Sequence, residues 1–155
     1  MSAGHEARLK ALGIELPSPA APAANYVPFT ISGKLVFVAG QITLWNGELR
    51  HIGKVGADLS VDDGVAAARL CGLNLISQAR AAAKGNLDGV ARCLKLGGFV
   101  NCTPDFTQHP VVINGASDLM VQVFGDAGKH ARFAVGAGSL PRGVAVEIEA
   151  IFELA

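Results

Sequence analysis

The final segment of the chain, residues 144–154, alternates between two sets of side chains, and no other segment restricts the fold as strongly. A period of two places successive side chains on opposite faces of a β-strand. One face of this strand is apolar, with Val146, Ile148, Ala150, Phe152 and Leu154. The opposite face carries Ala145, Glu147, Glu149, Ile151 and Glu153. The pattern therefore predicts a strand with one face in the core and the other face acidic.

The remaining patterns predict an α+β domain. Apolar runs predict strands over 27–32, 34–39, 91–101 and 132–137, with a short one near 49–52. A capping box from Ser60 to Asp63 opens a long helix that reaches about Lys84, and a second helix is expected over 112–125. This order predicts a mixed β-sheet with two helices packed on one face.

The first 24 residues differ from the rest of the chain. Residues 6–12 have helical spacing, and the stretch from Leu16 to Ala24 contains three prolines, which favour an extended course across a surface. We therefore divide the chain into an N-terminal helix and Pro/Ala-rich extension, 1–24, and a single domain, 25–155.

Composition excludes several function classes. Among 155 residues, 13 are Lys or Arg and 13 are Asp or Glu, so the net charge of zero argues against a nucleic acid or membrane surface as partner. No apolar run approaches the roughly 18–20 residues of a membrane span. Three cysteines without CxxC spacing favour reduced thiols and a cytoplasmic location. The histidines lack metal-ligand spacing, so no metal is assigned. A hydrophobic content of 50% favours an oligomer, with a monomer as the alternative.

Two charged residues near the C-terminus are the first candidates for function. Strands 132–137 and 144–154 are expected to form a hairpin, which would bring Arg132 near the middle of the last strand, on the face of Glu147. Ala134, Gly136 and Gly138 follow Arg132 on its side of the strand and would leave room above the sheet. A guanidinium can grip a carboxylate with two parallel bonds, and a neighbouring glutamate can activate water. A purely structural ion pair is an equal alternative.

At this point the sequence resembles a known family. Residues 130–150 match the form A-R-x-x-V…L-P-x-x-x-x-V-E-I-E-A, which is similar to the C-terminal signature of the Rid family of imine deaminases, also called YjgF-like or L-PSP endoribonuclease-like. Asn25-Tyr26-Val27 and Ala39-Gly40-Gln41-Ile42 resemble the tyrosine loop and a strand end of that family. The segment from Phe99 to Asn114 resembles another of its motifs, with a few extra residues in the loop.

The resemblance implies a chorismate-mutase-like (YjgF-like) fold and a homotrimer with clefts between subunits. It implies hydrolysis of 2-imino or enamine acids, such as 2-aminoacrylate, to 2-keto acids and ammonia without any cofactor. By position, Arg132 would hold the substrate carboxylate and Glu147 would position water, while Tyr26, Gly40 and Asn114 would bind substrate. For Asn114 a helix N-cap is an equal alternative.

Two further functions remain alternatives to the enzyme. The same cleft could serve a non-catalytic binding module for keto or imino acids. Ribonuclease activity ranks below both, because the chain is neutral and has few aromatic side chains on which bases could stack. The chain also departs from the family pattern at Ala134, where many members carry a cysteine, so any role of that thiol is lost.

Overall fold

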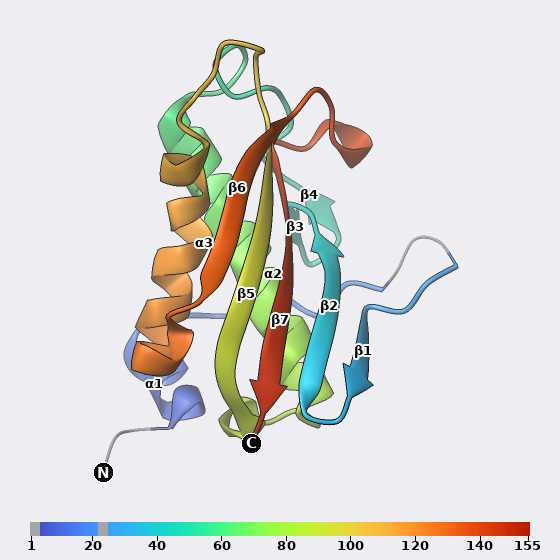
Figure 1. The fold of residues 1–155 in the computed structure, drawn as a ribbon, viewed down its shortest axis with the longest axis vertical. Coiled ribbons are helices and arrows are strands. Elements are labelled where there is room, and N and C mark those ends of the chain that lie inside the picture. Colours follow the sequence, from blue (N-terminus) through green and yellow to red (C-terminus); the bar gives the residue numbers. More distant parts are fainter. Residues whose placement is uncertain (1–3, 22–24) are drawn as a thin grey trace.

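A five-stranded sheet forms the centre of the fold (Figure 1), in a computed structural model that describes residues 4–21 and 25–155. Its strands lie in the order β1-β2-β7-β5-β6, and β5–β6 is the only parallel pair among them. The mixed sheet that the sequence predicted is thereby confirmed. The strand bounds are β1 (Phe29–Ser32), β2 (Leu35–Gln41), β5 (Val90–Asn101), β6 (Ala131–Ala137) and β7 (Val146–Leu154). A separate ribbon contains β3 (Leu44–Trp45) and β4 (Glu48–Leu49).

Two long helices cover one face of the sheet, as predicted (Figure 1). They are α2 (Val61–Ala82) and α3 (His109–Phe124). The predicted capping box starts α2, since Ser60 Oγ accepts from the Asp63 backbone N–H at 3.1 Å and the Asp63 carboxylate accepts from the Ser60 N–H at 2.9 Å. None of the helices in the described part of the chain combines the length and apolar character needed to cross a bilayer.

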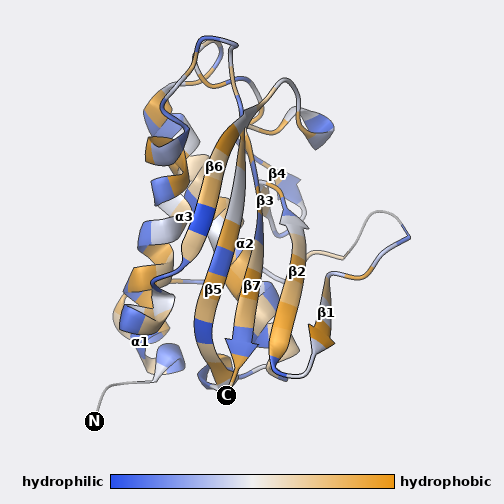
Figure 2. Ribbon diagram, viewed as in Figure 1, coloured by the Kyte–Doolittle hydropathy of each residue, from blue (hydrophilic) through white to orange (hydrophobic). Residues whose placement is uncertain are grey.

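The two faces of the sheet differ as the alternation in β7 predicted. Val146, Ile148, Ala150 and Phe152 are buried towards the helices. None of the helices that the structure describes covers the opposite face, and its apolar side chains Phe37, Phe99 and Val135 are 41%, 38% and 42% exposed. Figure 2 shows that the strands are largely hydrophobic along their length, with hydrophilic positions interspersed. We call the uncovered surface the open face.

The predicted hairpin between residues 132–137 and 144–154 is wrong. Strand β5 lies between β6 and β7 and pairs with both, in parallel with β6 and antiparallel with β7. The reason is the crossover through α3, which returns the chain parallel to β5 at the sheet edge. The segment 138–145 is long enough to carry the chain from the end of β6 past the end of β5 to the start of β7. Consecutive strands usually pair, but the central position beside β5 buries the apolar face of β7 more completely.

Helix α3 begins earlier than predicted, at His109 in place of residue 112. Gln108 is its N-cap, and Pro110 lies in the first turn, where a missing backbone N–H costs nothing. Asn114 therefore lies inside the helix with an exposed side chain, and the N-cap alternative for this residue is wrong.

The N-terminal segment packs against the sheet-and-helix unit. Leu9 of helix α1 (His5–Ala11) is 5% exposed and belongs to the main core. The Glu6 carboxylate accepts from Arg80 Nε at 2.8 Å and from the Leu87 backbone N–H at 2.7 Å. The division at residue 24 stays a prediction, and residues 22–24 lie outside the described ranges. The described part of the extension is nevertheless an integral part of the packing.

Replacing Leu9 by alanine tests this packing. We expect the free energy of unfolding to fall by about 2–4 kcal/mol, because a buried leucine loses its transfer energy and leaves a cavity. The matched control is Leu12→Ala at the end of the same helix, where the side chain is 49% exposed and little change is expected. Equal denaturant midpoints for the two variants would contradict the packing of α1 against the core.

Candidate functional site

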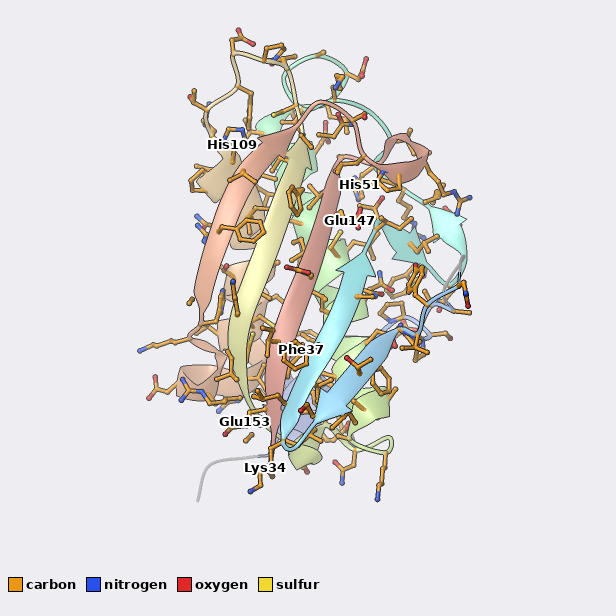
Figure 3. All side chains as sticks on the ribbon, turned by 45° about the vertical axis from the view of Figure 1, so that its right-hand side comes forward. Lys34, Phe37, His51, His109, Glu147 and Glu153 are labelled. Carbon is orange, nitrogen blue, oxygen red and sulfur yellow. The ribbon has the colours of Figure 1, made fainter. Side chains whose placement is uncertain are left out.

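Glu147 forms part of the wall of a cavity among the described residues. Its side chain projects from β7 and is half-buried, and Figure 3 shows it near the upper end of the sheet, at the β2 side. The cavity has a volume of about 320 Å³ and is lined by Glu147 together with Tyr26 and Gly40. Its other walls come from Ala20, Ala21, Pro28, Gln41, Ile42, Leu44, Asn74, Pro141 and Arg142. We call this cavity the Glu147 pocket.

An irregularity in β2 brings its backbone close to Glu147. Val38 pairs with Ala150 of β7, and Gln41, three residues later, pairs with Ile148, only two residues away from Ala150. This β-bulge leaves one extra residue on β2 and re-aims the chain locally. A Cβ atom built on Gly40 would lie 3.1 Å from the carboxyl carbon of Glu147 and closer still to Oε2. Glycine is thus required at position 40, because the backbone there lies so close to Glu147 that any side chain would displace the carboxylate.

The pKa of Glu147 is raised above the ordinary range of a glutamate. Partial burial is the main cause, since it disfavours the charged form, and the neighbouring negative charge of Glu149 adds to it. A carboxyl group whose pKa is raised in a cavity exchanges its proton at a higher pH than a free glutamate does, which suits it to general acid–base chemistry.

Arg132 lies elsewhere, at the edge strand β6. Its Nη1 donates to Ser117 Oγ at 3.0 Å, and its Nη2 donates to the Pro110 carbonyl at 3.2 Å. His130 Nε2 lies 2.9 Å from Ser117 Oγ, and His130 Nδ1 lies 2.6 Å from the Gly128 carbonyl oxygen. These bonds orient the guanidinium along α3 and use two of its five N–H donors, so donors remain for a ligand.

Asn114 shares a helix face with the partners of Arg132. Pro110, Asn114 and Ser117 are spaced by four and three residues on α3, which places their side chains on one side of the helix. We call Arg132, Asn114 and Ser117 the arginine cluster.

The structure does not bring Arg132 and Glu147 together within one chain, contrary to the hairpin prediction. Arg132 is in register with Leu96, which pairs with Ala150 on the helix-covered face. Glu147 pairs with Phe99, whose side chain lies on the open face. Two strand spacings and three residue rises separate the two Cα atoms by roughly 14 Å, with the side chains on opposite faces.

The first glycine after Arg132 on its side of the strand, Gly136, does not leave an empty space. A Cβ atom on Gly136 would lie 2.7 Å from His109 Nε2 and 2.9 Å from Cys102 Sγ. Figure 3 shows His109 beside the end of β6. Gly136 is therefore explained by the close approach of these two side chains, so the predicted room is wrong at this position, whereas Gly138 has open space around it.

The predicted site residues thus form two groups. Tyr26, Gly40 and Glu147 line the Glu147 pocket, whereas Arg132 bonds to the face of α3 that also carries Asn114. The sequence prediction missed two residues. Ser117 could have been found from its helical spacing to Asn114, whereas nothing in the sequence indicated that Arg142 lines the pocket. No group of three or more His, Cys, Asp or Glu side chains within the described ranges could hold a metal ion.

Comparisons with known proteins identify relatives along nearly the whole chain. The protein TCP17 of Trypanosoma cruzi is 50% identical over 149 residues, covering 96% of this chain and 92% of TCP17. Atu1372 of Agrobacterium tumefaciens, a protein of unknown function, is 47% identical with a TM-score of 0.90, covering 97% of this chain and 92% of that one. A putative endoribonuclease from Shewanella oneidensis is 36% identical with a TM-score of 0.93, covering 98% and 100%.

Other structures align at lower identity and over less of the chain. RidA from an Antarctic Psychrobacter is 25% identical with a TM-score of 0.60, covering 88% of this chain and 94% of RidA. Escherichia coli TdcF is 26% identical with a TM-score of 0.61, covering 90% and 94%. The profile of the family described as "YjgF/chorismate mutase-like, putative endoribonuclease" matches residues 6–150. The chain belongs to this YjgF/chorismate mutase-like family and has its fold.

Proposed function

We propose that the protein is a cofactor-free deaminase that hydrolyses 2-imino acids, or their enamine tautomers, to 2-keto acids and ammonia. The observation that carries the proposal is the Glu147 carboxyl group. It is half-buried in a pocket of about 320 Å³, its pKa is raised, and Gly40 leaves it just enough space. TdcF of Escherichia coli, which this chain resembles, has been crystallised with bound serine. Like a 2-imino acid, serine is a small compound that carries its nitrogen on the carbon next to a carboxylate.

Glu147 acts as the general base in this proposal. The ionised carboxylate takes a proton from water as the water oxygen bonds to the imine carbon. The tetrahedral adduct then passes protons to its nitrogen, the C–N bond breaks, and the carbonyl forms as ammonia leaves. No electrons are exchanged, so water is the only co-reactant.

Arg132 holds the substrate carboxylate, but it has to come from a second copy of the chain. Within one chain it lies on the opposite side of the sheet from Glu147, and the imine carbon is bonded directly to the carboxylate carbon. A substrate this small cannot reach both groups. We therefore propose a homotrimer in which the arginine cluster of one subunit faces the Glu147 pocket of the next. The exposed apolar side chains of the open face, including Phe37, Phe99 and Val135, supply a surface suited to such an assembly.

The direct test is catalysis by the wild-type protein. An amino-acid oxidase generates 2-imino acids in solution, and the rate of keto acid formation is followed with and without the protein. The proposal requires an acceleration over the spontaneous rate for several imino acids. Tight binding of the keto acids without any acceleration would instead support a binding module.

The pH profile provides a second test. The active form of Glu147 is ionised, so kcat/KM should fall as the pH drops through the pKa of Glu147. Because that pKa is raised, this acidic limb should lie above the value of about 4.3 of a free glutamate. Glu149→Gln removes the neighbouring charge and should move the limb to lower pH. An acidic limb that is the same in both proteins would contradict the assignment of Glu147 as the base.

Gly40→Ala tests the contact between Gly40 and Glu147. The new methyl group would push the carboxylate aside, so we expect kcat/KM to fall by about tenfold or more, because a small misplacement of a catalytic group has a large effect on rate. The melting temperature should change little, since the displaced atoms are at the end of a flexible side chain. Gly138→Ala, just after β6, is the control for a glycine substitution that leaves Glu147 untouched, because a Cβ atom there meets open space and the backbone is not in a conformation that requires glycine.

A further inference from the structure

A second cavity, of about 360 Å³, adjoins the Glu147 pocket and shares part of its lining. Five residues line both cavities, namely Ala20, Ala21, Leu44, Asn74 and Arg142. Tyr26, Gly40 and Glu147 line only the first cavity. The shared residues therefore mark a junction between the two cavities, on a different part of the pocket wall from Tyr26, Gly40 and Glu147.

Arg142 supplies the positive charge at this junction. It forms no salt bridge with any residue that the structure describes, unlike Arg50 and Arg80, which are each within 3.4 Å of a carboxylate oxygen. Both N–H groups of the buried Asn74 are used, at 2.6 Å by the Leu44 carbonyl and at 3.1 Å by the Leu70 carbonyl. The free hydrogen-bond donors at the junction are therefore those of the Arg142 guanidinium.

The backbone of Arg142 is in an unfavourable conformation. Its φ of 58° and ψ of 16° are left-handed, which glycine adopts far more readily than arginine. The surrounding loop is fixed, because the Gly53 N–H donates to the Gly143 carbonyl and the Ala145 N–H donates to the His51 carbonyl, both at 2.9 Å. A strained residue held in a rigid loop at a cavity indicates that its side chain has a function there.

The opposite wall of the junction is also fixed. It is formed by Ala20 and Ala21, from the N-terminal segment that crosses α2. Gln78 Nε2 donates to the Ala20 carbonyl at 2.9 Å, and Ser77 Oγ donates to the Pro17 carbonyl at 2.7 Å. Both side chains are buried, so the segment is held against the helix by bonds from its interior. This wall of small residues leaves space for a ligand in front of Arg142.

We propose that Arg142 selects substrates with a second carboxylate at the end of the side chain, so that the preferred substrates are 2-imino dicarboxylic acids. The inference rests on the proposed deaminase function. The α-carboxylate is held by Arg132 of a neighbouring copy, the imine carbon lies at Glu147, and the side chain extends to the junction. A guanidinium with free donors pairs with such a carboxylate through two parallel bonds.

The test compares two imino acids of equal chain length, 2-iminoglutarate and 2-iminopentanoate. The wild-type protein should have the higher kcat/KM for 2-iminoglutarate. Arg142→Gln should lower that value by about 10- to 100-fold and change the value for 2-iminopentanoate by less than about threefold, while Arg142→Lys, which keeps the charge but loses the two parallel bonds, should retain only part of the preference. Arg142→Gly removes the charge and relieves the strain of the left-handed backbone. Its kcat/KM for 2-iminoglutarate should fall as that of Arg142→Gln does, and it should be at least as stable as the wild type. Equal losses on both substrates, or no loss on either, would overturn the inference.

Binding of the two keto acid products separates this inference from the proposed function. Calorimetry on the wild-type protein should show tighter binding of 2-oxoglutarate than of 2-oxopentanoate, and Arg142→Gln should abolish the difference. If that holds and no imino acid is hydrolysed, the subsite stands and the deaminase proposal fails. If imino acids are hydrolysed but Arg142→Gln leaves the binding difference intact, the subsite is wrong and the deaminase proposal stands.

Discussion

Arg132→Ala is expected to lower kcat/KM for 2-imino acids by about 10²-fold or more. Loss of a bidentate carboxylate contact removes several kcal/mol of transition-state binding, and the orientation of the substrate is lost with it. The measurement is keto acid formation from imines generated in situ. Arg92→Ala is the matched control, because Arg92 is exposed on β5, so its rate should remain that of the wild type. An Arg132→Ala variant as fast as wild type would exclude a role for this arginine.

Mixing two variants tests whether Arg132 and Glu147 act from different subunits, as proposed. Arg132→Ala and Glu147→Gln are each inactive alone in this proposal. When the two variants are dissociated, mixed in equal amounts and reassembled, some sites receive an intact Arg132 from one chain and an intact Glu147 from the next. Random assembly would restore about a quarter of the sites. No recovery of activity in verified mixed oligomers would contradict the shared site.

Glu147→Gln is expected to lower kcat by about 10²- to 10⁴-fold, the usual contribution of a general base. Glutamine keeps the size of the side chain but cannot take a proton from water. The matched control is Glu153→Gln on the same face of β7, which Figure 3 shows at the far end of the strand, and it should keep the wild-type rate. A Glu147→Gln variant that retains wild-type kcat would remove this residue from the mechanism.

Stability should move in the opposite direction from activity in Glu147→Gln. The pKa of Glu147 is raised in the folded state, so its ionised form is favoured less there than in the unfolded chain. The charge therefore costs stability at neutral pH, and this cost disappears as the pH falls through the raised pKa. Thermal unfolding at neutral pH should show Glu147→Gln to be at least as stable as wild type, which also separates loss of chemistry from loss of fold.

The local patterns predicted most of the fold because they depend on neighbours in the sequence. The alternation in 144–154 gave the buried and exposed faces of β7 correctly, since a period of two needs no tertiary information. The capping box at Ser60 and the core helix that follows it were correct for the same reason. The sequence pattern places the start of α3 three residues too late, because the proline in the first turn interrupts the apolar periodicity without interrupting the helix.

The candidate site could be predicted in its residue types but not in its assembly. Glu147 and Gly40 were identified from the sequence, and their contact depends on a bulge in β2 that no local pattern revealed. Arg142 was missed because its importance comes from two cavities formed by the N-terminal segment, α2 and the loop after β6. These elements are distant in sequence, and only their packing makes them neighbours.

The sequence by itself determined which faces of β7 are apolar and acidic, and which charged residues could carry chemistry. The tertiary structure decided that β5 separates β6 from β7, which places Arg132 and Glu147 on opposite faces of one sheet. The physical reason is that side-chain alternation fixes the two faces of each strand, whereas strand order depends on where the apolar faces are best buried. A site that uses both residues therefore requires contact between two copies of the chain.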